Sequence, residues 1–155
     1  MQKLTLKSPV FEESKAIPSK YTSDGENISP PLTWSEVPKG AKSLALISDD
    51  PDSPMGTWVH WVVYNIPPTA TGLPEKILQT EKLPDGTLQG LSDFKKTGYC
   101  GPCPPAGTHH YFFKLYALDI LLPDKPGLTK SGLESLMNGH ILAQGELVGL
   151  YKRKK

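Results

Sequence analysis

The chain has 155 residues, of which 37% are hydrophobic and 21% charged, so it can bury a core and falls outside the intrinsically disordered class. Its 14 glycines and 16 prolines are spread along the whole length and exclude long helices, because proline removes a backbone donor and interior glycine costs backbone entropy. The formal net charge is +1, but without the basic tail at residues 152–155 it is −3, which excludes a nucleic-acid-binding surface.

Residues 1–155 are expected to form a single domain, with the tail 152–155 disordered. No apolar run approaches the roughly 20 residues that a membrane-spanning helix needs, and the first seven residues alternate polar and apolar side chains, unlike a signal peptide. We therefore expect a cytoplasmic protein. A weak contact between the basic tail and an anionic membrane surface is an alternative to the favoured interpretation, a solvated tail.

Strands are expected where apolar residues follow a two-residue period or form a short run between turn signals. Residues 43–48 form such a run, with a Pro-Lys-Gly turn before it and Asp-Pro after it. Residues 58–65 alternate, which puts His60 on the same face as Val62 and Tyr64. Residues 109–117 alternate as well, and weaker candidates are residues 4–10, 89–91 and 146–151.

A single helix is expected near the C-terminus, where apolar side chains recur at helical spacing. Ser131 with Glu134 three residues later resembles a capping box at the start of this helix. His140, on the apolar stripe, is most simply a packed or capping histidine near the helix C-terminus. The positions of the stripe are Leu133, Leu136, Met137, His140 and Ile141.

Long turn-rich segments separate these elements, at residues 18–31, 67–74 and 93–107. Strands joined by such loops, with one late helix, predict a mainly β fold, an antiparallel two-sheet β-sandwich with one or two short helices. No internal repeat and no linker between domains is visible.

The first group of residues able to carry chemistry begins where an apolar strand ends at Asp50. An antiparallel return would bring Asp50 beside His60 in the next strand, so that the carboxylate holds the imidazole and raises its pKa. The alternative is ordinary turn chemistry in the Asp-Pro-Asp-Ser-Pro segment at residues 50–54, with His60 a satisfied core histidine. From spacing alone this alternative is favoured.

The second group lies in residues 98–111. His109 and Tyr111 are two residues apart on a predicted strand and share a face, whereas His110 points the other way. Imidazolium and phenol both donate hydrogen bonds, and turn amides near Gly107 would add donors, so this corner suits an anion. An edge strand whose polar side chains face water fits this segment equally well when it is taken alone.

Residues 100–103, Cys-Gly-Pro-Cys, have the pattern of a thioredoxin-type redox centre. Pro104 and Pro105 follow at once and exclude a helix whose dipole would activate the first cysteine, so the redox interpretation fails. A zinc site made from both cysteines and His109 or His110 lacks a fourth ligand. A reduced, packed pair or an incidental disulfide is expected, with no metal and no cofactor.

Six motifs follow one another along the chain: Gly-Glu-Asn-Ile-Ser-Pro-Pro-Leu-Thr-Trp at 25–34, Asp-Pro-Asp-Ser-Pro at 50–54, Trp-Val-His-Trp-Val-Val at 58–63, Gly-Pro-Cys-Pro-Pro at 101–105, His-His-Tyr at 109–111 and Gly-His-Ile-Leu-Ala at 139–143. Together they resemble the phosphatidylethanolamine-binding protein family, and more narrowly its bacterial and archaeal branch, often labelled Raf-kinase-inhibitor-like. The resemblance runs from about Phe11 to Tyr151 in the same order. No one motif suffices, but the set is specific.

The resemblance implies a β-sandwich with a small pocket at one end that binds phosphate, a carboxylate such as acetate, or the phosphoryl head group of a lipid. Phosphate oxygens would accept hydrogen bonds from His60, His109 and Tyr111, while an ethanolamine ammonium would lie against Asp50 or Asp52. With no catalytic residue assigned, the implied ligand-binding residues are Asp50, Asp52, Trp58, His60, Pro105, His109 and Tyr111.

Two positions and one missing element depart from the family pattern. Cys100 stands where many relatives have a small residue, and His110 replaces an arginine common in animal members. The C-terminal helix of animal members has no counterpart after Tyr151, which leaves a surface that prokaryotic relatives use to form homodimers. We therefore expect a homodimer.

The sequence predicts a non-catalytic binding protein with a small-anion pocket that modulates a protein partner such as a kinase or a protease. The alternative is a hydrolase of phosphate or acyl esters in which His60 or His109, with Asp50, acts as general base. No obvious nucleophile lies beside these residues, the nearest hydroxyl in sequence being that of Ser53. A third interpretation is a protein that inhibits proteases or kinases by surface contact alone.

Overall fold

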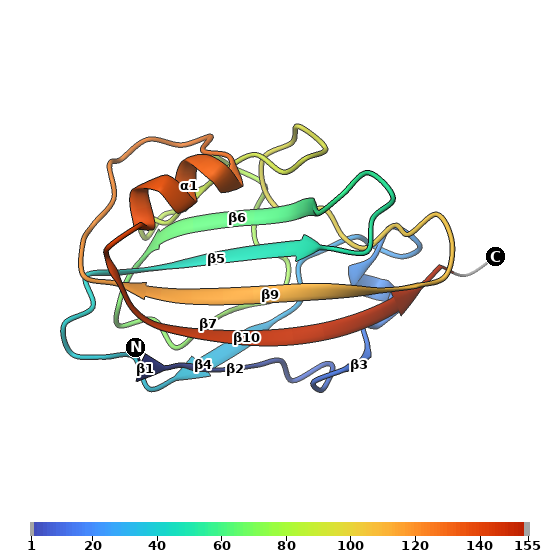
Figure 1. Cartoon of the computed structure of the whole chain (residues 1–155), viewed down its shortest axis with the longest axis horizontal. Helices are drawn as coiled ribbons and strands as arrows, with labels where there is room; N and C mark the ends of the chain where they lie inside the picture. Colours follow the sequence, from blue (N-terminus) through green and yellow to red (C-terminus); the bar gives the residue numbers. More distant parts are fainter. Residues whose placement is uncertain (1, 154–155) are drawn as a thin grey trace.

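The structure is a computed structural model that describes residues 2–153. Its strands form a seven-stranded sheet and a three-stranded sheet (Figure 1). The larger sheet contains β1 (Gln2–Lys3), β3 (Lys15–Ala16), β5 (Ser43–Asp50), β6 (Trp58–Ile66), β8 (Leu88–Gln89), β9 (Thr108–Leu118) and β10 (Ile141–Lys152). The smaller sheet contains β2 (Thr5–Lys7), β4 (Leu32–Ser35) and β7 (Gly72–Leu73), and the helices are α1 (Lys130–Met137) and the single-turn η1 (Ser19–Tyr21).

The four long strands lie in the order β10, β9, β5, β6, each antiparallel to its neighbour, with β8 beyond β6. Both β1 and β3 pair with the free edge of β10, and these two short pairings are parallel. The predicted mainly β fold of two sheets with a short helix is confirmed.

Both faces of the large sheet are buried, which is why β5 and β6 read as nearly continuous apolar runs. On one face Leu46 and Trp61 belong to a cluster with Trp34 of the small sheet. On the other face Val62 belongs to a cluster with Leu133 of α1, and Figure 1 shows this helix lying over β6. The sheet is therefore the middle layer of the molecule, and the hydrophobic effect holds it from both sides.

A β-bulge interrupts the pairing of β5 with β6. Residues 48–49 pair with Trp61 and Val59 respectively, so His60 is an extra residue on β6. The predicted alternation therefore fails at this point, because Val59 and Val62 lie in one cluster on the helix side while His60 turns to the opposite face. Placing His60 on the face of Val62 was wrong.

Pairing in space also corrects other predicted boundaries. Residues 4–10 do not form one strand, because the chain leaves β1 in the large sheet and enters β2 in the small sheet, with Leu4 buried between them. The predicted strand 146–151 is the second half of the longer β10. Ile141 begins that strand, so it does not continue the helix.

The helix begins one residue after Thr129, not at the capping box predicted for Ser131. The Thr129 hydroxyl oxygen accepts a hydrogen bond from the Gly132 backbone amide at 3.2 Å. The helix ends at Met137, so His140 lies outside it, with Nδ1 2.8 Å from Oδ1 of Asp119.

Removing this cap gives a first testable prediction. We expect Thr129→Ala to lower the free energy of unfolding by about 1 kcal/mol, because a first-turn amide loses its acceptor. Ser131→Ala should change stability by less than about half as much, since Ser131 caps no amide. Urea unfolding of both variants measures the difference, and a larger loss for Ser131→Ala would restore the sequence-based assignment.

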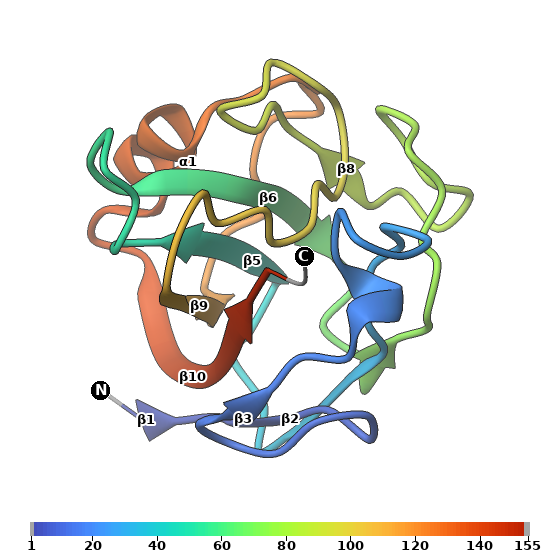
Figure 2. The ribbon, with the colours of Figure 1, turned by 90° about the vertical axis from the view of Figure 1, so that its right-hand side faces the viewer.

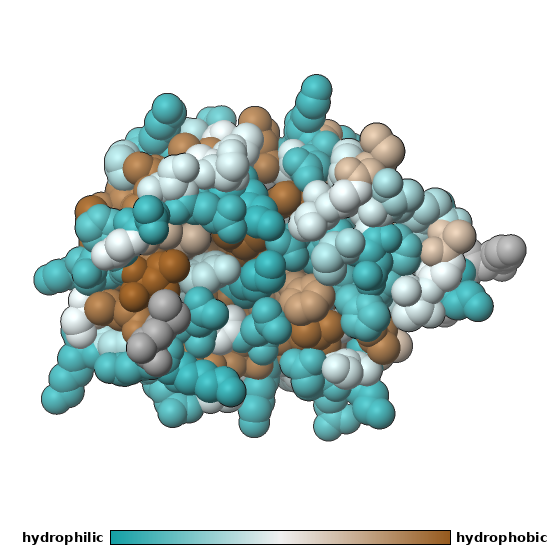
Figure 3. All heavy atoms as spheres, viewed as in Figure 1, coloured by the Kyte–Doolittle hydropathy of each residue, from teal (hydrophilic) through white to brown (hydrophobic). Residues whose placement is uncertain are grey.

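The surface and the C-terminal end carry two further observations. No helix within residues 2–153 is long and apolar enough to cross a membrane. In Figure 3 hydrophobic residues lie in separate patches among hydrophilic ones on the face shown. The basic tail was predicted to be disordered from residue 152 onward. Lys152 is instead the last residue of β10, and Arg153 Nε lies 3.4 Å from Oδ1 of Asp24. Residues 154–155 lie outside the described part.

Candidate ligand-binding site

A pocket of about 280 Å³ opens at one end of the large sheet. β5 ends there and β6 and β9 begin there, so the turn at 51–57 and the long connection before β9 meet around it; Figure 2 looks at this end. The lining residues are Asp50, Ser53, Pro54, Met55, Trp58, His60, Phe94, Cys103, Pro105, His109 and Tyr111. Six of the seven predicted site residues are thus brought together.

Asp50 and His109 form a buried pair in this pocket. Asp50 Oδ2 lies 2.7 Å from His109 Nδ1, and the two side chains are 5% and 9% exposed. The other carboxylate oxygen accepts a hydrogen bond from the backbone amide of Asp52 at 2.8 Å. Because a carboxylate only accepts, Nδ1 carries the proton and His109 Nε2 is the nitrogen left for a ligand. Of the two interpretations of Asp50, direct pairing with His60 was therefore wrong, whereas its hydrogen bond to the Asp52 amide is the turn chemistry that the favoured alternative predicts.

His60 is buried and hydrogen-bonds to the backbone. Its Nδ1 lies 2.6 Å from the carbonyl oxygen of Cys100, so Nδ1 is the donor and Nε2 remains for the pocket. Burial lowers the pKa of His60, although the Cys100 carbonyl and the Asp50 carboxylate act in the opposite direction. The rise in pKa that pairing with Asp50 would have caused is therefore absent, the buried and hydrogen-bonded ring agrees with the favoured alternative, and the neutral ring offers an acceptor at Nε2.

Tyr111 lies between the two histidines. Its ring centroid is 5.3 Å from that of His60, nearly perpendicular to it, and 6.4 Å from that of His109, nearly parallel. Burial, with the charge of Asp50, raises the pKa of Tyr111, so the hydroxyl keeps its proton near neutral pH. Its hydroxyl oxygen is buried and makes no hydrogen bond of ordinary length and angle within residues 2–153, although the Asp50 carboxylate and the Cys103 backbone lie near enough to influence its pKa. Such an atom costs free energy until an acceptor completes it.

Asp52 does not line the pocket. Its Oδ2 accepts a hydrogen bond from the backbone amide of His110 at 2.8 Å and lies 2.7 Å from His110 Nδ1, with side chains 40% and 53% exposed. The hydrogen bonds from the His110 side chain and backbone lower the pKa of Asp52. Asp52 therefore fastens the turn after β5 to β9. Gly107, expected to supply amide donors, is also outside the lining.

Part of the lining is an apolar wall formed by Met55, Trp58 and Phe94, and of these three only Trp58 was predicted from the sequence. Trp58 was predicted, but Phe94 was not, and its ring centroid lies 5.6 Å from that of Trp58 and 5.4 Å from that of His60. Met55 also lines the pocket and is 79% exposed. An isolated aromatic residue in a loop carries no periodicity, so nothing in the sequence singled out Phe94.

The Cys-Gly-Pro-Cys corner is coil, as predicted, and no helix follows it before β9. Both cysteines are free, Cys100 buried and Cys103 partly exposed at the pocket, so of the two expected states, a reduced pair or a disulfide, the structure has the reduced one. Across residues 2–153 no group of three or more histidine, cysteine or acidic side chains is arranged to hold a metal ion.

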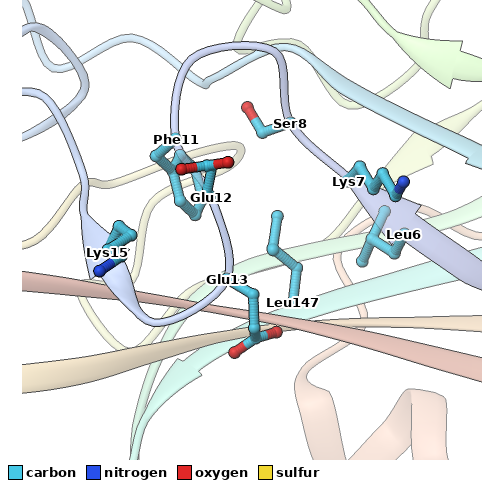
Figure 4. A pocket seen from close by; sticks show the side chains of 8 residues that line it. All are labelled: Leu6, Lys7, Ser8, Phe11, Glu12, Glu13, Lys15 and Leu147. Carbon is cyan, nitrogen blue, oxygen red and sulfur yellow. The ribbon is translucent and has the colours of Figure 1, made fainter.

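A larger hollow of about 570 Å³ lies elsewhere, beside β2, β3 and β10 (Figure 4). In Figure 4 Lys7 and Lys15 lie to either side of Leu147. Both carboxylate oxygens of Glu13 already accept hydrogen bonds within the protein, from the Val148 amide at 3.2 Å and from the Ser14 hydroxyl at 3.0 Å. With no histidine, tyrosine or cysteine in its lining, this hollow offers less chemistry than the smaller pocket.

The lowered pKa of His60 predicts how stability depends on pH. An unfolded His60 titrates near 6.5 and the folded one below that value, so between the two the unfolded chain binds more protons. The free energy of unfolding should therefore fall as the pH drops below 6.5. We expect urea unfolding to show this slope, by at most about 1.4 kcal/mol per pH unit, and His60→Gln to weaken it. An identical slope in His60→Gln would contradict the assignment.

Comparison with known proteins agrees with the fold. The profile of the phosphatidylethanolamine-binding protein family matches residues 7–152. A UPF0098 protein of Methanothermobacter thermautotrophicus is 54% identical over 150 residues, which cover 97% of this chain and 99% of that protein.

Two crystal structures are similar over nearly the whole chain. A phosphatidylethanolamine-binding protein homologue from Chlamydia trachomatis has 43% identity and a TM-score of 0.91, covering 99% of this chain and 100% of the other. YbcL of E. coli has 35% identity and a TM-score of 0.89, covering 98% and 99%. The chain belongs to the phosphatidylethanolamine-binding protein family, in the branch that contains the UPF0098 and YbcL proteins of bacteria and archaea.

Proposed function

We propose that the pocket binds the oxyanion of a small ligand, a phosphate, phosphoryl or carboxylate group, and that the protein acts as a binding protein without catalysis. The observation that carries the proposal is the buried Tyr111 hydroxyl, which has no well-aligned acceptor within residues 2–153 although it lies near the Asp50–His109 pair. An oxyanion supplies that acceptor, and a hydrogen bond to a charged oxygen is among the stronger ones in proteins.

The two histidines give this pocket a mixed hydrogen-bonding character. Tyr111 donates through its hydroxyl, while neutral His60 accepts at Nε2. His109 Nε2 donates when it carries a proton and accepts when it does not. A phosphate or phosphoryl group that still bears one proton matches this set, because it has several acceptor oxygens and one donor.

Recognition of an ethanolamine ammonium has less support than recognition of the phosphoryl group. Asp50 already has both oxygens engaged, by His109 and by a backbone amide. Asp52 is engaged by His110 and lies outside the lining. The proposal therefore concerns the anion and assigns no site to a cation.

Titration with inorganic phosphate tests the proposal. In a two-dimensional NMR titration at millimolar phosphate, we expect the signals of His60, His109 and Tyr111 to shift with one common dissociation constant. Tyr111→Phe removes only the hydroxyl and should weaken binding about 10-fold, since one hydrogen bond to a charged group is lost. Unshifted signals in the unmodified protein would overturn the proposal.

Hydrolysis is the second candidate, because Asp50 orients His109 as a general base would be oriented. It lacks a nucleophile, since no hydrogen bond in the described chain joins Ser53 or Cys103 to a pocket histidine, and the Ser53 hydroxyl accepts from the Met55 amide at 3.3 Å. A panel of phosphate and acyl esters decides between the two candidates: turnover that disappears in His109→Ala, at the candidate base, or in His60→Ala would establish an enzyme.

Modulation of a kinase or protease, and assembly as a homodimer, form the remaining part of the proposal. If a partner is recognised through the pocket, inhibition should be lost in Tyr111→Phe together with phosphate binding. Inhibition that survives in this variant would favour recognition by surface contact alone. Sedimentation velocity at micromolar concentration measures the oligomeric state.

A further inference from the structure

We propose that the ligand of this pocket is an aryl oxyanion, a small molecule whose phosphate or carboxylate group is attached to an aromatic ring, and that Met55 and Phe94 select the ring. The inference rests on the proposed function, which supplies the site for the anion. It adds a second subsite, formed by Met55 and Phe94, beside the residues that face the anion, and it thereby specifies the class of ligand.

The first argument is the position of exposed hydrophobic side chains. The described chain has four large hydrophobic residues that are exposed, Met55, Leu78, Phe94 and Leu121, and two of them line this pocket. Exposed apolar groups that line a pocket together with a few polar groups are typical of a ligand-binding site, where they are covered when the ligand enters.

The second argument is that the backbone segments carrying both residues are held in place before any ligand arrives. The loop of Phe94 is fixed to the start of β6, because the Val59 amide donates to Asp93 Oδ2 at 2.8 Å and the Asp93 amide donates to the Val59 carbonyl at 2.9 Å. The Phe94 amide donates to the Ser92 hydroxyl at 3.2 Å. A wall fixed in this way binds without a large ordering cost.

The turn of Met55 is fixed as well. The Gly56 amide donates to the Ser53 carbonyl at 3.1 Å, and Asp52 ties the turn to β9 through His110. Met55 itself remains flexible at its side chain, and a thioether makes favourable contacts with the edge of an aromatic ring. Phe94 stands edge-on to Trp58, at an interplanar angle of 82°, which is a favoured arrangement of two aromatic rings and orients the Phe94 ring at the pocket.

The third argument is size. The pocket has about 280 Å³, while an apolar cavity of about 150 Å³ holds a benzene ring and a water molecule takes up roughly 30 Å³. One ring therefore leaves room for about four waters, the space of a tetrahedral oxyanion. The pocket is slightly smaller than the roughly 300–1,000 Å³ of sites for drug-sized ligands. It is therefore too small to enclose the two acyl chains of a membrane lipid.

Competition among three simple phosphates tests the inference by isothermal titration calorimetry. We expect phenyl phosphate to bind about 10-fold or more tightly than methyl phosphate, and more tightly than hexyl phosphate. The ratio of phenyl to methyl phosphate should fall towards one in Phe94→Ala and in Met55→Ala. Phe94→Leu keeps apolar volume without a ring and should lose most of the preference. Leu121→Ala, at a residue 65% exposed and outside the pocket, is the matched control and should keep it.

The possible outcomes distinguish failure of the aryl subsite from failure of the proposed anion binding. No binding of inorganic phosphate or of any of the three esters overturns the proposed function. Binding of phosphate with equal affinities for phenyl and methyl phosphate overturns only the aryl subsite. Hexyl phosphate binding as tightly as phenyl phosphate also overturns it, because a flexible alkyl chain would then fill the wall as well as a ring does.

Discussion

His109→Leu is expected to lower the free energy of unfolding by about 3 kcal/mol and to weaken phosphate binding about 10-fold or more. The substitution removes the partner that lies 2.7 Å from Asp50 and leaves the carboxylate in a site where it is 5% exposed. A buried charge without its partner costs the desolvation free energy that the pair had offset. The loss of binding has a separate cause, since His109 Nε2 is one of the groups that face the anion.

The neighbouring position supplies the control. His110→Leu removes an equally short contact, 2.7 Å to Asp52, but both side chains there are about half exposed to solvent. We expect a change in the free energy of unfolding within about 0.5 kcal/mol, because solvent screens the pair. Adding Asp50→Asn to His109→Leu should recover part of the stability, since the uncompensated charge is then gone. Equal losses in His109→Leu and His110→Leu would contradict the assignment of the buried pair.

The strands that carry this site could be predicted from the sequence, because their spacing reflects burial on two faces. The alternation of residues 109–117 gave the correct common face of His109 and Tyr111. The short strands could not be predicted, since β3 and β7 have two residues each and exist only through pairing with strands far along the chain. Their positions depend on tertiary contacts, which leave no local period in the sequence.

Most of the residues that line the pocket could be named from the sequence, but not which of their side chains pair with one another. Placing Asp50 beside His60 followed from an antiparallel return between β5 and β6, and their register does run that way, with Asp50 opposite Trp58. The carboxylate nevertheless binds a residue of β9, the strand on the other side of β5. A sequence shows which residues share a strand end, whereas the choice between two neighbouring strands depends on side-chain direction and on the bulge at His60.

The backbone at Gly101 joins the wall of the pocket to the segment that contains Tyr21 and Asn27. Its amide donates to Asn27 Oδ1 at 2.7 Å, and a Cβ atom added to it would lie 2.3 Å from the backbone oxygen of Tyr21 and 2.6 Å from Asn27 Oδ1. The preceding carbonyl, that of Cys100, holds His60 Nδ1. A displacement of this corner therefore moves the acceptor that orients His60.

Gly101→Ala is accordingly expected to lower the free energy of unfolding by about 3 kcal/mol, because the atoms that the new methyl group meets include backbone, which cannot move aside cheaply. Phosphate affinity should fall in the fraction that remains folded, since His60 loses its fixed orientation. Gly132→Ala in α1 is the matched control: its Cβ atom would meet the nearest atom at 3.5 Å, and alanine favours a helix by up to about 1 kcal/mol over glycine, so stability should rise. Urea unfolding and a phosphate titration of both variants check the two effects, and a Gly101→Ala protein as stable as the unmodified chain would mean that this corner is not anchored by Tyr21 and Asn27.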